Sequence, residues 1–304
     1  MRNVTLKQLR LLRTAARDGS FAAAAAVFHL TPPAVTMQMH QLETEAGLQL
    51  FERVGRRLTL TAAGREVLAA AERIDVALAD CTESLVALTT LNSGSVTLGA
   101  VSTAKYFVPR MLAGFARNNP QIHIELVIGN RDETIMEFSA GRFDVTVMGR
   151  PPEGMEVESA PIGDHPYVFV APPSHPLARC RRIAAIKLAT ETILMREPGS
   201  GTRMLAERFL TKSGIAPRIG MQIWSNETIK QAVIAGLGIA FISTHTIEAE
   251  IKERRLVVLN VAGLPEVRRW FVVRPTAKRL MPAARALRDF LTAEGRRFLP
   301  NVLK

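Results

Sequence analysis

The sequence predicts an α/β protein with an all-α head, and three observations lead to this fold class. Residues 5–46 carry only helical patterns of apolar residues, separated by turn signals. Residues 61–91 carry one long helical pattern, and residues 93–304 alternate strand-like and helical runs, as an α/β region with parallel sheets does. A chain of 304 residues that is 47% hydrophobic is long enough for two or three domains, each with its own core.

Residues 20–43 are typical of two short helices separated by a turn, following a first helix at residues 5–17. The second helix of the pair begins after Thr31, an N-cap residue, and has Pro32 and Pro33 in its first turn, where a missing N–H costs little. Apolar positions at i, i+4 and i+7 predict a buried stripe of Val35, Met39 and Leu42. The side chains that then face outward are Thr36, Met37, Gln38, His40 and Gln41. Such a helix suits the DNA major groove, although an ordinary αα-hairpin would show the same stripe.

The segment LQLFERVGRRLTLT follows Gly47 and alternates weakly around Gly55, which predicts a small β-wing. Its tip carries Arg53, Arg56 and Arg57. Arginine side chains at such a tip suit phosphates or a narrow minor groove. An isolated hairpin of this kind would more often be a solvated surface feature, but its position directly after the helix pair favours DNA binding. We therefore expect a winged helix-turn-helix domain at residues 1–60.

Thr61 can cap a long helix that runs to about Leu91. Its apolar positions are spaced alternately by four and three residues, which makes a heptad seam. The seam consists of Val67, Ala71, Ile74, Leu78, Cys81, Leu85 and Leu88. We interpret residues 61–92 as a linker helix that dimerises, because two DNA-reading units held apart match an operator with two-fold symmetry.

The remainder of the chain is predicted to fold as two α/β lobes that enclose a cleft. We expect lobe I at residues 93–162 and 268–304, and lobe II at residues 163–267, with the last strand and helix returning to lobe I. Ligands bind such sheets beyond the carboxyl ends of the strands and against helix N-termini. The effector-binding residues predicted on this basis are Ser102, Thr103, Lys105, Asn130, Arg131, Gly149, Arg150, Arg196, Ser200, Gly201, Thr202, Arg203, Asn226 and Thr228.

Each predicted Ser or Thr could simply cap a helix, but four arginines lie in four separate loops predicted to line this one cleft. They are Arg131, Arg150, Arg196 and Arg203. Guanidinium groups that converge in this way would neutralise a dianion or several phosphates.

The N-terminal block resembles the LysR-type transcriptional regulators. The resemblance rests on LRLLRTAARDGSFAAAAAVFHLTPPAVTMQMHQLE and on the LFER, GRRLT and AAG elements that lead into the long helix. Within this family the chain is similar to the Calvin-cycle operon regulators (CbbR-like), through VSTAKYFVPRMLAGF, REPGSGTR and SNETIKQAVIAGLGIAFIS. The resemblance implies a winged helix-turn-helix, a linker helix and a two-lobed effector domain of the periplasmic-binding-protein type. It also implies a cytoplasmic regulator of a carbon-fixation operon that works as a dimer or, more often in the family, a tetramer.

Family base contacts carry over to the start of the recognition helix at Thr31, Pro32, Pro33, Thr36 and Met37, with Gln38 and His40 as neighbours. Pro32 stands where the family often has glutamine, and Met37 where it often has arginine. Both positions lose hydrogen-bonding capacity toward bases, so we expect more indirect readout through the wing. The family effectors imply a small phosphorylated metabolite, such as ribulose bisphosphate, phosphoenolpyruvate or a related sugar phosphate, with NADPH in some members. An aromatic or other carboxylate is the alternative effector.

The other function classes lack their sequence signals. The chain contains no GxGxxG, GxxxxGK[ST] or GxSxG motif, and its six histidines and two cysteines show no metal-ligand spacing, so we expect no enzyme activity, cofactor or metal. A two-lobed solute-binding protein would need a signal peptide in place of a DNA-binding head, and the N-terminus has no continuous apolar h-region. No stretch is typical of a membrane span. The expected partners are double-stranded DNA, a small anion, a second copy of the chain and, as a further candidate, RNA polymerase.

The net charge of +11 is unevenly distributed. Residues 1–60 hold 8 basic and 4 acidic side chains, and residues 268–304 hold 10 and 2. The excess is therefore not concentrated in the predicted DNA-binding head, and charge alone gives that function only weak support.

Overall fold

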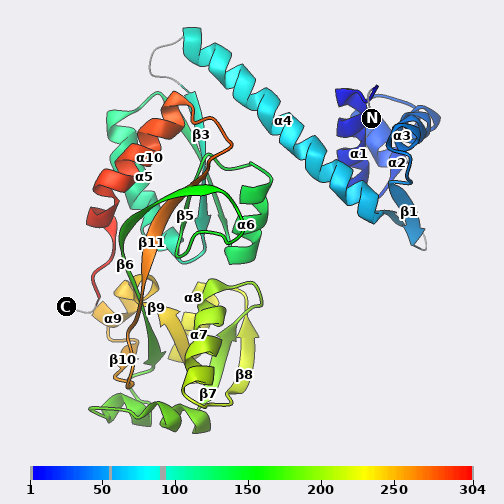
Figure 1. Ribbon diagram of the computed structural model, residues 1–304. Helices are drawn as coiled ribbons and strands as arrows, with labels where there is room; N and C mark the ends of the chain where they lie inside the picture. Colours follow the sequence, from blue (N-terminus) through cyan, green and yellow to red (C-terminus); the bar gives the residue numbers. More distant parts are fainter. Residues whose placement is uncertain (1–2, 55–56, 90–93, 303–304) are drawn as a thin grey trace. The chain divides into compact units, whose positions relative to one another are not determined.

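The computed structural model describes residues 3–54, 57–89 and 94–302, with the backbone alone described at residues 54, 57 and 83–89 (Figure 1). It divides into two compact units, Met1–Thr82 and Glu83–Lys304. None of the helices in the described ranges is long and apolar enough to cross a membrane.

Unit 1 begins with three helices, α1 (Leu6–Asp18), α2 (Phe21–Val27) and α3 (Pro32–Ala46). Thr5 and Gln8 form a reciprocal capping box at the start of α1, which satisfies free N–H groups there. The stripe predicted for α3 is confirmed, because its three apolar members are buried within the core of the unit. They are Val35, Met39 and Leu42.

A two-stranded hairpin and a long helix complete the N-terminal part of the chain. Strands β1 (Phe51–Val54) and β2 (Arg57–Leu60) pair antiparallel, as predicted for the wing. Helix α4 (Ala62–Thr89) follows, and the Thr61 hydroxyl caps it by accepting a 3.0 Å hydrogen bond from the Gly64 N–H.

Unit 2 contains a nine-stranded sheet in the order β4-β3-β5-β11-β6-β9-β7-β8, with β10 paired to β6. The first lobe holds three parallel strands, covered by helices whose apolar side chains pack against them in one core. Its elements are β3 (Gly94–Val101), η1 (Ala104–Tyr106), α5 (Val108–Asn118), β4 (Ile122–Gly129), α6 (Arg131–Ser139), β5 (Val145–Met148), α10 (Pro282–Glu294) and η5 (Gly295–Phe298).

The second lobe repeats this plan with parallel pairing of β7 to β8 and to β9, and has two core clusters of its own. Its elements are η2 (Pro176–Arg179), η3 (Ala185–Thr190), β7 (Thr192–Arg196), α7 (Gly201–Lys212), β8 (Arg218–Ile223), α8 (Asn226–Ile234), β9 (Ile239–Ser243), η4 (Thr244–Thr246), α9 (Glu248–Lys252) and β10 (Val257–Leu259).

Two long strands, β6 (Val157–Ala171) and β11 (Glu266–Pro275), run through both lobes and join them (Figure 1). They pair antiparallel with each other, and β11 also pairs antiparallel with β5. The prediction of parallel sheets is therefore right within each lobe and wrong at the crossovers, because a strand that leaves a lobe and one that returns to it run in opposite directions.

The helical segment that follows β3 is divided in two. It forms the short η1 and, after a break at Phe107, helix α5. Pro109 lies in the first turn of α5, where a proline begins a helix readily but cannot continue one from the preceding turn.

Candidate functional site

The outward face of α3 carries the side chains predicted to read DNA. Thr31, Pro32, Pro33, Thr36, Met37 and His40 are exposed, and Gln38 is half-buried. Five of them line a groove in unit 1, together with other residues of the same helix and two of the N-terminal segment. The lining consists of Pro32, Pro33, Thr36, Met37, His40, Gln41, Thr44, Glu45, Asn3 and Gln8. The exposed fraction of Met37 is 56%. An exposed thioether on this face is available for apolar contact with a base.

Part of the hydrogen-bonding capacity of this face is used within the helix. The Thr36 hydroxyl donates to the Pro32 carbonyl at 3.0 Å, and the Gln38 amide donates to Gln41 Oε1 at 3.2 Å. The Thr31 side chain makes no capping bond in the described structure, and Pro32 and Pro33 leave the first two helical positions without an N–H to donate. Thr31 therefore keeps its hydroxyl available, whereas His40 Nδ1 lies 3.6 Å from the Glu43 carboxylate.

The wing carries one arginine whose side chain can be placed. Arg53 is exposed on β1 and pairs across the hairpin with Leu58. The predicted Arg56 lies outside the described residues, and Arg57 is described by its backbone in β2 alone. The predicted role of these arginines at the minor groove stays a prediction.

The predicted dimer seam on α4 is divided by its surroundings. Val67 and Ala71 are buried in the core of unit 1, with 8% and 3% exposed, so they serve this core and are not free to meet a second copy. Ile74 and Leu78 are each 38% exposed and Cys81 is exposed. Leu85 and Leu88 lie outside the side chains that the structure describes. Heptad spacing alone does not distinguish the part of a helix that packs on its own domain from the part that pairs.

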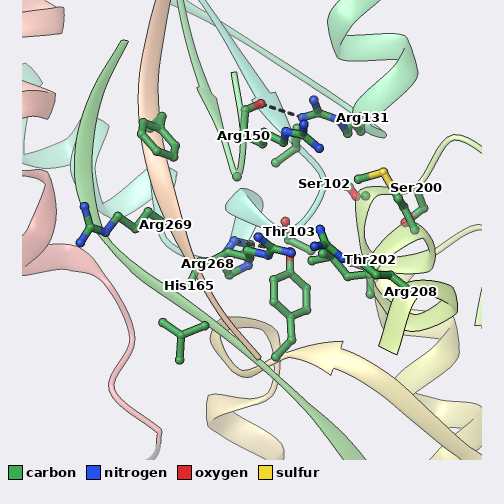
Figure 2. Close-up of a pocket in the computed structure, with 18 of the residues that line it drawn as sticks. Ser102, Thr103, Arg131, Arg150, His165, Ser200, Thr202, Arg208, Arg268 and Arg269 are labelled. Carbon is green, nitrogen blue, oxygen red and sulfur yellow. Dashed lines mark hydrogen bonds between the residues drawn. The ribbon is translucent and has the colours of Figure 1, made fainter. Parts of the chain in front are cut away.

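A cavity of about 420 Å³ lies in unit 2, where the two lobes and the crossover strands meet (Figure 2). It opens at the carboxyl ends of β3 and β5 and at the N-terminus of α7, as the fold predicts for a ligand site. The predicted residues that line it are Ser102, Thr103, Arg131, Gly149, Arg150, Ser200, Gly201 and Thr202.

Six predicted residues do not line this cavity, and the first three of them are Asn130, Arg196 and Asn226. Asn130 caps α6 by accepting a 3.0 Å bond from the Glu133 N–H. Arg196 is buried, pairs with Glu197 at 2.7 Å and donates to Asn226. None of these three residues lines the cavity, although Asn226 Nδ2 is buried without a hydrogen-bond partner among the described residues.

The remaining three also have contacts outside the cavity. Arg203 pairs with Glu207 at 2.7 Å, one helical turn away. The Lys105 ammonium lies 5.2 Å from the ring centroid of Tyr106. Thr228 lies in the first turn of α8, where its N–H donates to Ser225.

Five lining residues with titratable side chains were not predicted from the sequence. They are His165, Tyr167, Arg208, Arg268 and Arg269. Arg208 lies two turns into α7, and the other four lie on the crossover strands β6 and β11, which the sequence analysis did not place at a ligand site. The basic excess of residues 268–304 was the available signal for Arg268 and Arg269.

The electrostatics of the cavity favour an anion. Five arginines line it, and no carboxylate does so among the residues that the structure describes. Burial and the neighbouring Arg150 lower the pKa of Arg131, because both disfavour its positive charge. Arg131 is held in place by donating to the carbonyl of Arg150 at 2.7 Å (Figure 2). A bound anion would remove this unfavourable charge interaction.

Two further groups point to the same ligand class. The Arg268 Nε atom is buried and has no hydrogen-bond partner among the described residues, although its Nη2 pairs with Glu266 at 2.9 Å. Ser200 makes no side-chain cap on the twelve-residue α7 in the described structure, and Gly201 and Thr202 of its first turn line the cavity. Free N–H groups at the start of a helix bind anions.

The imidazole of His165 and the phenol ring of Tyr167 also line the cavity. His165 stacks on Trp270 with ring centroids 3.8 Å apart, and its Nε2 lies 2.9 Å from the Ser243 hydroxyl. Burial lowers the pKa of His165 well below its ordinary value and that of His245 to about 4. Both imidazoles are therefore neutral at pH 7, and the positive charge of the cavity comes from its arginines.

Sequence comparison identifies both parts of the chain. Residues 6–65 match the description "Bacterial regulatory helix-turn-helix protein, lysR family", and residues 89–296 match "LysR substrate binding domain". The HTH-type transcriptional regulator CbbR of Xanthobacter flavus is 53% identical over 300 residues, which cover 98% of this chain and 90% of that protein. The RuBisCO operon transcriptional regulator of Allochromatium vinosum is 44% identical over 295 residues, or 97% of this chain and 98% of that protein.

Solved structures agree with this assignment. The regulatory domain of Synechocystis PCC6803 CcmR in complex with 2-PG is 33% identical, has a TM-score of 0.64, and covers 66% of this chain and 96% of that one. Full-length CbnR complexed with its target DNA shares the fold, with a TM-score of 0.69 at 21% identity over 94% of this chain and 98% of that one. The chain belongs to the LysR family of bacterial transcriptional regulators.

Proposed function

We propose that this regulator controls a carbon-fixation operon and responds to a small phosphorylated metabolite bound in the cavity of unit 2. The observation that carries the effector class is the lining of five arginines without a carboxylate in the described part of the chain. Phosphate groups match this lining, because a guanidinium binds phosphate through two parallel hydrogen bonds and the α7 N-terminus adds backbone donors.

The names of similar proteins support the proposal that the regulated operon is one for carbon fixation. Regulators named for CbbR or for the RuBisCO operon are 53% and 44% identical to this chain over nearly its whole length. The CcmR regulatory domain, which is 33% identical, binds 2-PG in its solved complex. An effector that binds the closed arrangement of the two lobes more tightly than the open one, or the reverse, would shift the equilibrium toward the arrangement that it prefers. This change would reorient the paired DNA-reading units.

The assembly and its partners are part of the same proposal. Two copies pair through α4, two such dimers form a tetramer, and the assembly binds an operator with two-fold symmetry in the bacterial cytoplasm. The exposed apolar positions Ile74 and Leu78 support the pairing step. At a promoter that it activates, the assembly would also contact RNA polymerase.

Calorimetry on the full-length protein tests the effector class. Ribulose bisphosphate, phosphoenolpyruvate and 2-phosphoglycolate are titrated in turn, with benzoate and a dihydroxybenzoate as carboxylate probes. We expect saturable binding of at least one phosphorylated compound, and a loss of about tenfold or more in affinity for Arg268→Gln, since a charged hydrogen bond contributes roughly 1.5–3 kcal/mol. Arg203→Gln is the matched control, because Arg203 pairs with Glu207 and does not line the cavity. Tight binding of a carboxylate and none of a phosphorylated compound would overturn the proposal.

A further inference from the structure

The backbone around Leu50 joins the recognition helix, the wing and the linker helix. The Leu50 N–H donates to Glu43 Oε1 at 2.9 Å, and the Phe51 N–H donates to the same oxygen at 3.3 Å. The Leu50 carbonyl accepts from the Thr61 N–H at 3.0 Å. Leu50 itself is 1% exposed, so these groups have little access to water. We refer to this set of contacts as the Leu50 junction.

Glu43 is the contribution of the recognition helix to the junction. It follows the buried Leu42 on α3. Its side chain is only 19% exposed, which is low for a glutamate. One carboxylate oxygen accepts both wing N–H groups, and the other lies 3.6 Å from His40 Nδ1 on the DNA-facing side of the same helix. A charged acceptor strengthens both backbone hydrogen bonds and fixes their direction.

Thr61 and Gly64 are the contribution of the linker helix. The Thr61 hydroxyl donates to the Gln49 carbonyl at 2.8 Å and accepts from the Gly64 N–H at 3.0 Å. A Cβ atom at Gly64 would lie 2.1 Å from the Leu50 carbonyl oxygen, so only glycine permits α4 to approach the junction this closely. The segment before β1 is thus held by α3 on its N–H side and by the start of α4 on its carbonyl side.

We propose that Glu43 is a positioning residue for DNA recognition, which sets the wing at a fixed angle to the recognition helix. A short hairpin has little core of its own to orient it, and β1 and β2 contain only four residues each. Major-groove contacts by α3 and backbone or minor-groove contacts by the wing require both elements in register on one duplex. Glu43 provides this register through the two N–H groups at the root of the wing. Without the carboxylate, these N–H groups are left buried without a partner, and the wing loses its connection to α3.

The test measures where the wing contacts DNA. The full-length protein is bound to a duplex enriched from a random-sequence library by the wild type, and hydroxyl-radical footprints and affinities are recorded from 50 to 200 mM salt. For Glu43→Ala we expect about tenfold weaker binding, a shallower salt dependence, and loss of protection in the flanking minor groove while the half-site core stays protected. Glu43→Gln retains an oxygen acceptor and is expected to restore the flanking protection.

Asp75→Ala is the matched control for charge. It also removes one negative charge from unit 1, but Asp75 lies on α4 and pairs with Arg10 and Arg13 of α1, at 3.2 and 2.6 Å. We expect it to leave the footprint unchanged. Thr61→Val, which removes the hydroxyl contacts from the other side of the junction, is expected to reproduce the flanking loss and serves if Glu43→Ala does not fold. Equal footprints for Glu43→Ala and Asp75→Ala, or a uniform loss of protection with an unchanged salt slope, would overturn the proposal.

Discussion

The phenol of Tyr106, in the first lobe of unit 2, donates a 2.5 Å hydrogen bond to the carboxylate of Glu227, in the second lobe. Lys230 supports both partners, since its Nζ lies 4.7 Å from the Tyr106 ring centroid and 3.1 Å from Glu227 Oε2. The same ammonium forms a buried 2.8 Å pair with Glu250. These four residues form a polar contact between the lobes.

This interlobe contact lies close to the effector cavity. Arg196 donates to Asn226, the residue before Glu227 on α8, and its Nη2 lies 3.5 Å from the Ser102 hydroxyl. Ser102 lines the cavity, so a ligand that moves it acts on a chain of contacts ending at Tyr106. Ligand binding is coupled to the interlobe contact in this way only if the ligand changes the relative stability of two arrangements of the lobes.

We predict that Tyr106→Phe weakens the interlobe contact. Burial and Glu227 raise the pKa of the phenol, which therefore stays protonated and able to donate throughout the working range of pH. Loss of a hydrogen bond to a charged acceptor is expected to lower the free energy of unfolding of unit 2 by about 1–2 kcal/mol, measured by chemical denaturation. Arg110→Gln is the control, because Arg110 also reaches the other lobe, at Glu248, but as an exposed pair 3.8 Å apart that contributes little.

Stability of unit 2 is predicted to fall as the pH drops from 6.5 toward 4. Burial lowers the pKa of His245 from 6.5 to about 4, so in this range the unfolded chain binds a proton that the folded protein does not. The contribution of the neutral His245 to the free energy of unfolding is complete above pH 6.5, and roughly 3 kcal/mol of it is lost by pH 4. Denaturation series at pH 7, 5.5 and 4.5 measure it. In His245→Gln, whose amide oxygen can still accept from Trp270, the slope should be smaller; parallel curves for the two proteins would contradict the assignment.

Arg53→Ala is predicted to reduce operator affinity and the dependence of binding on salt. Arg53 is exposed on the wing, where a guanidinium in contact with phosphates releases counterions on binding. The slope of log K against log salt should become shallower by about 1 for each lost contact in a gel-shift titration. Arg17→Ala provides the comparison, because Arg17 is engaged with Asp18 at 2.7 Å on α1. An unchanged slope in Arg53→Ala would count against contact between the wing and DNA.

Ile74→Asp and Leu78→Asp are predicted to shift the protein from dimer toward monomer. Each places a charge at an exposed seam position, where it would be desolvated against a second helix. Sedimentation velocity across a concentration series measures the shift. Ala77→Asp, at an exposed neighbour outside the seam, is expected to leave association unchanged. Identical sedimentation of all three variants would exclude this part of α4 from the interface.

The candidate site could be predicted in part, and the successes and errors have separate causes. Ser102, Thr103 and Gly149 follow strands, and Ser200 precedes a helix, so the rule that ligands lie at such ends places them correctly. Arg196 and Arg203 satisfy the same rule but are bound by Glu197 and Glu207. The sequence does not show which cations already have an intramolecular partner. Distances between side chains decide this, and they exist only after folding.

The sequence by itself determined the elements of this protein. Helix caps such as Thr5 and Ser20, the stripe on α3 and the strand runs of both lobes are local patterns, since the physical forces behind them act over a few residues. Only the tertiary structure decided which residues of different elements lie together in a cavity or in a core. It brought Arg268 of β11 and His165 of β6 to one cavity, although 102 positions separate 165 from 268. It also placed Val67 and Ala71 in the core of unit 1, because burial depends on what packs against a helix as well as on its own pattern.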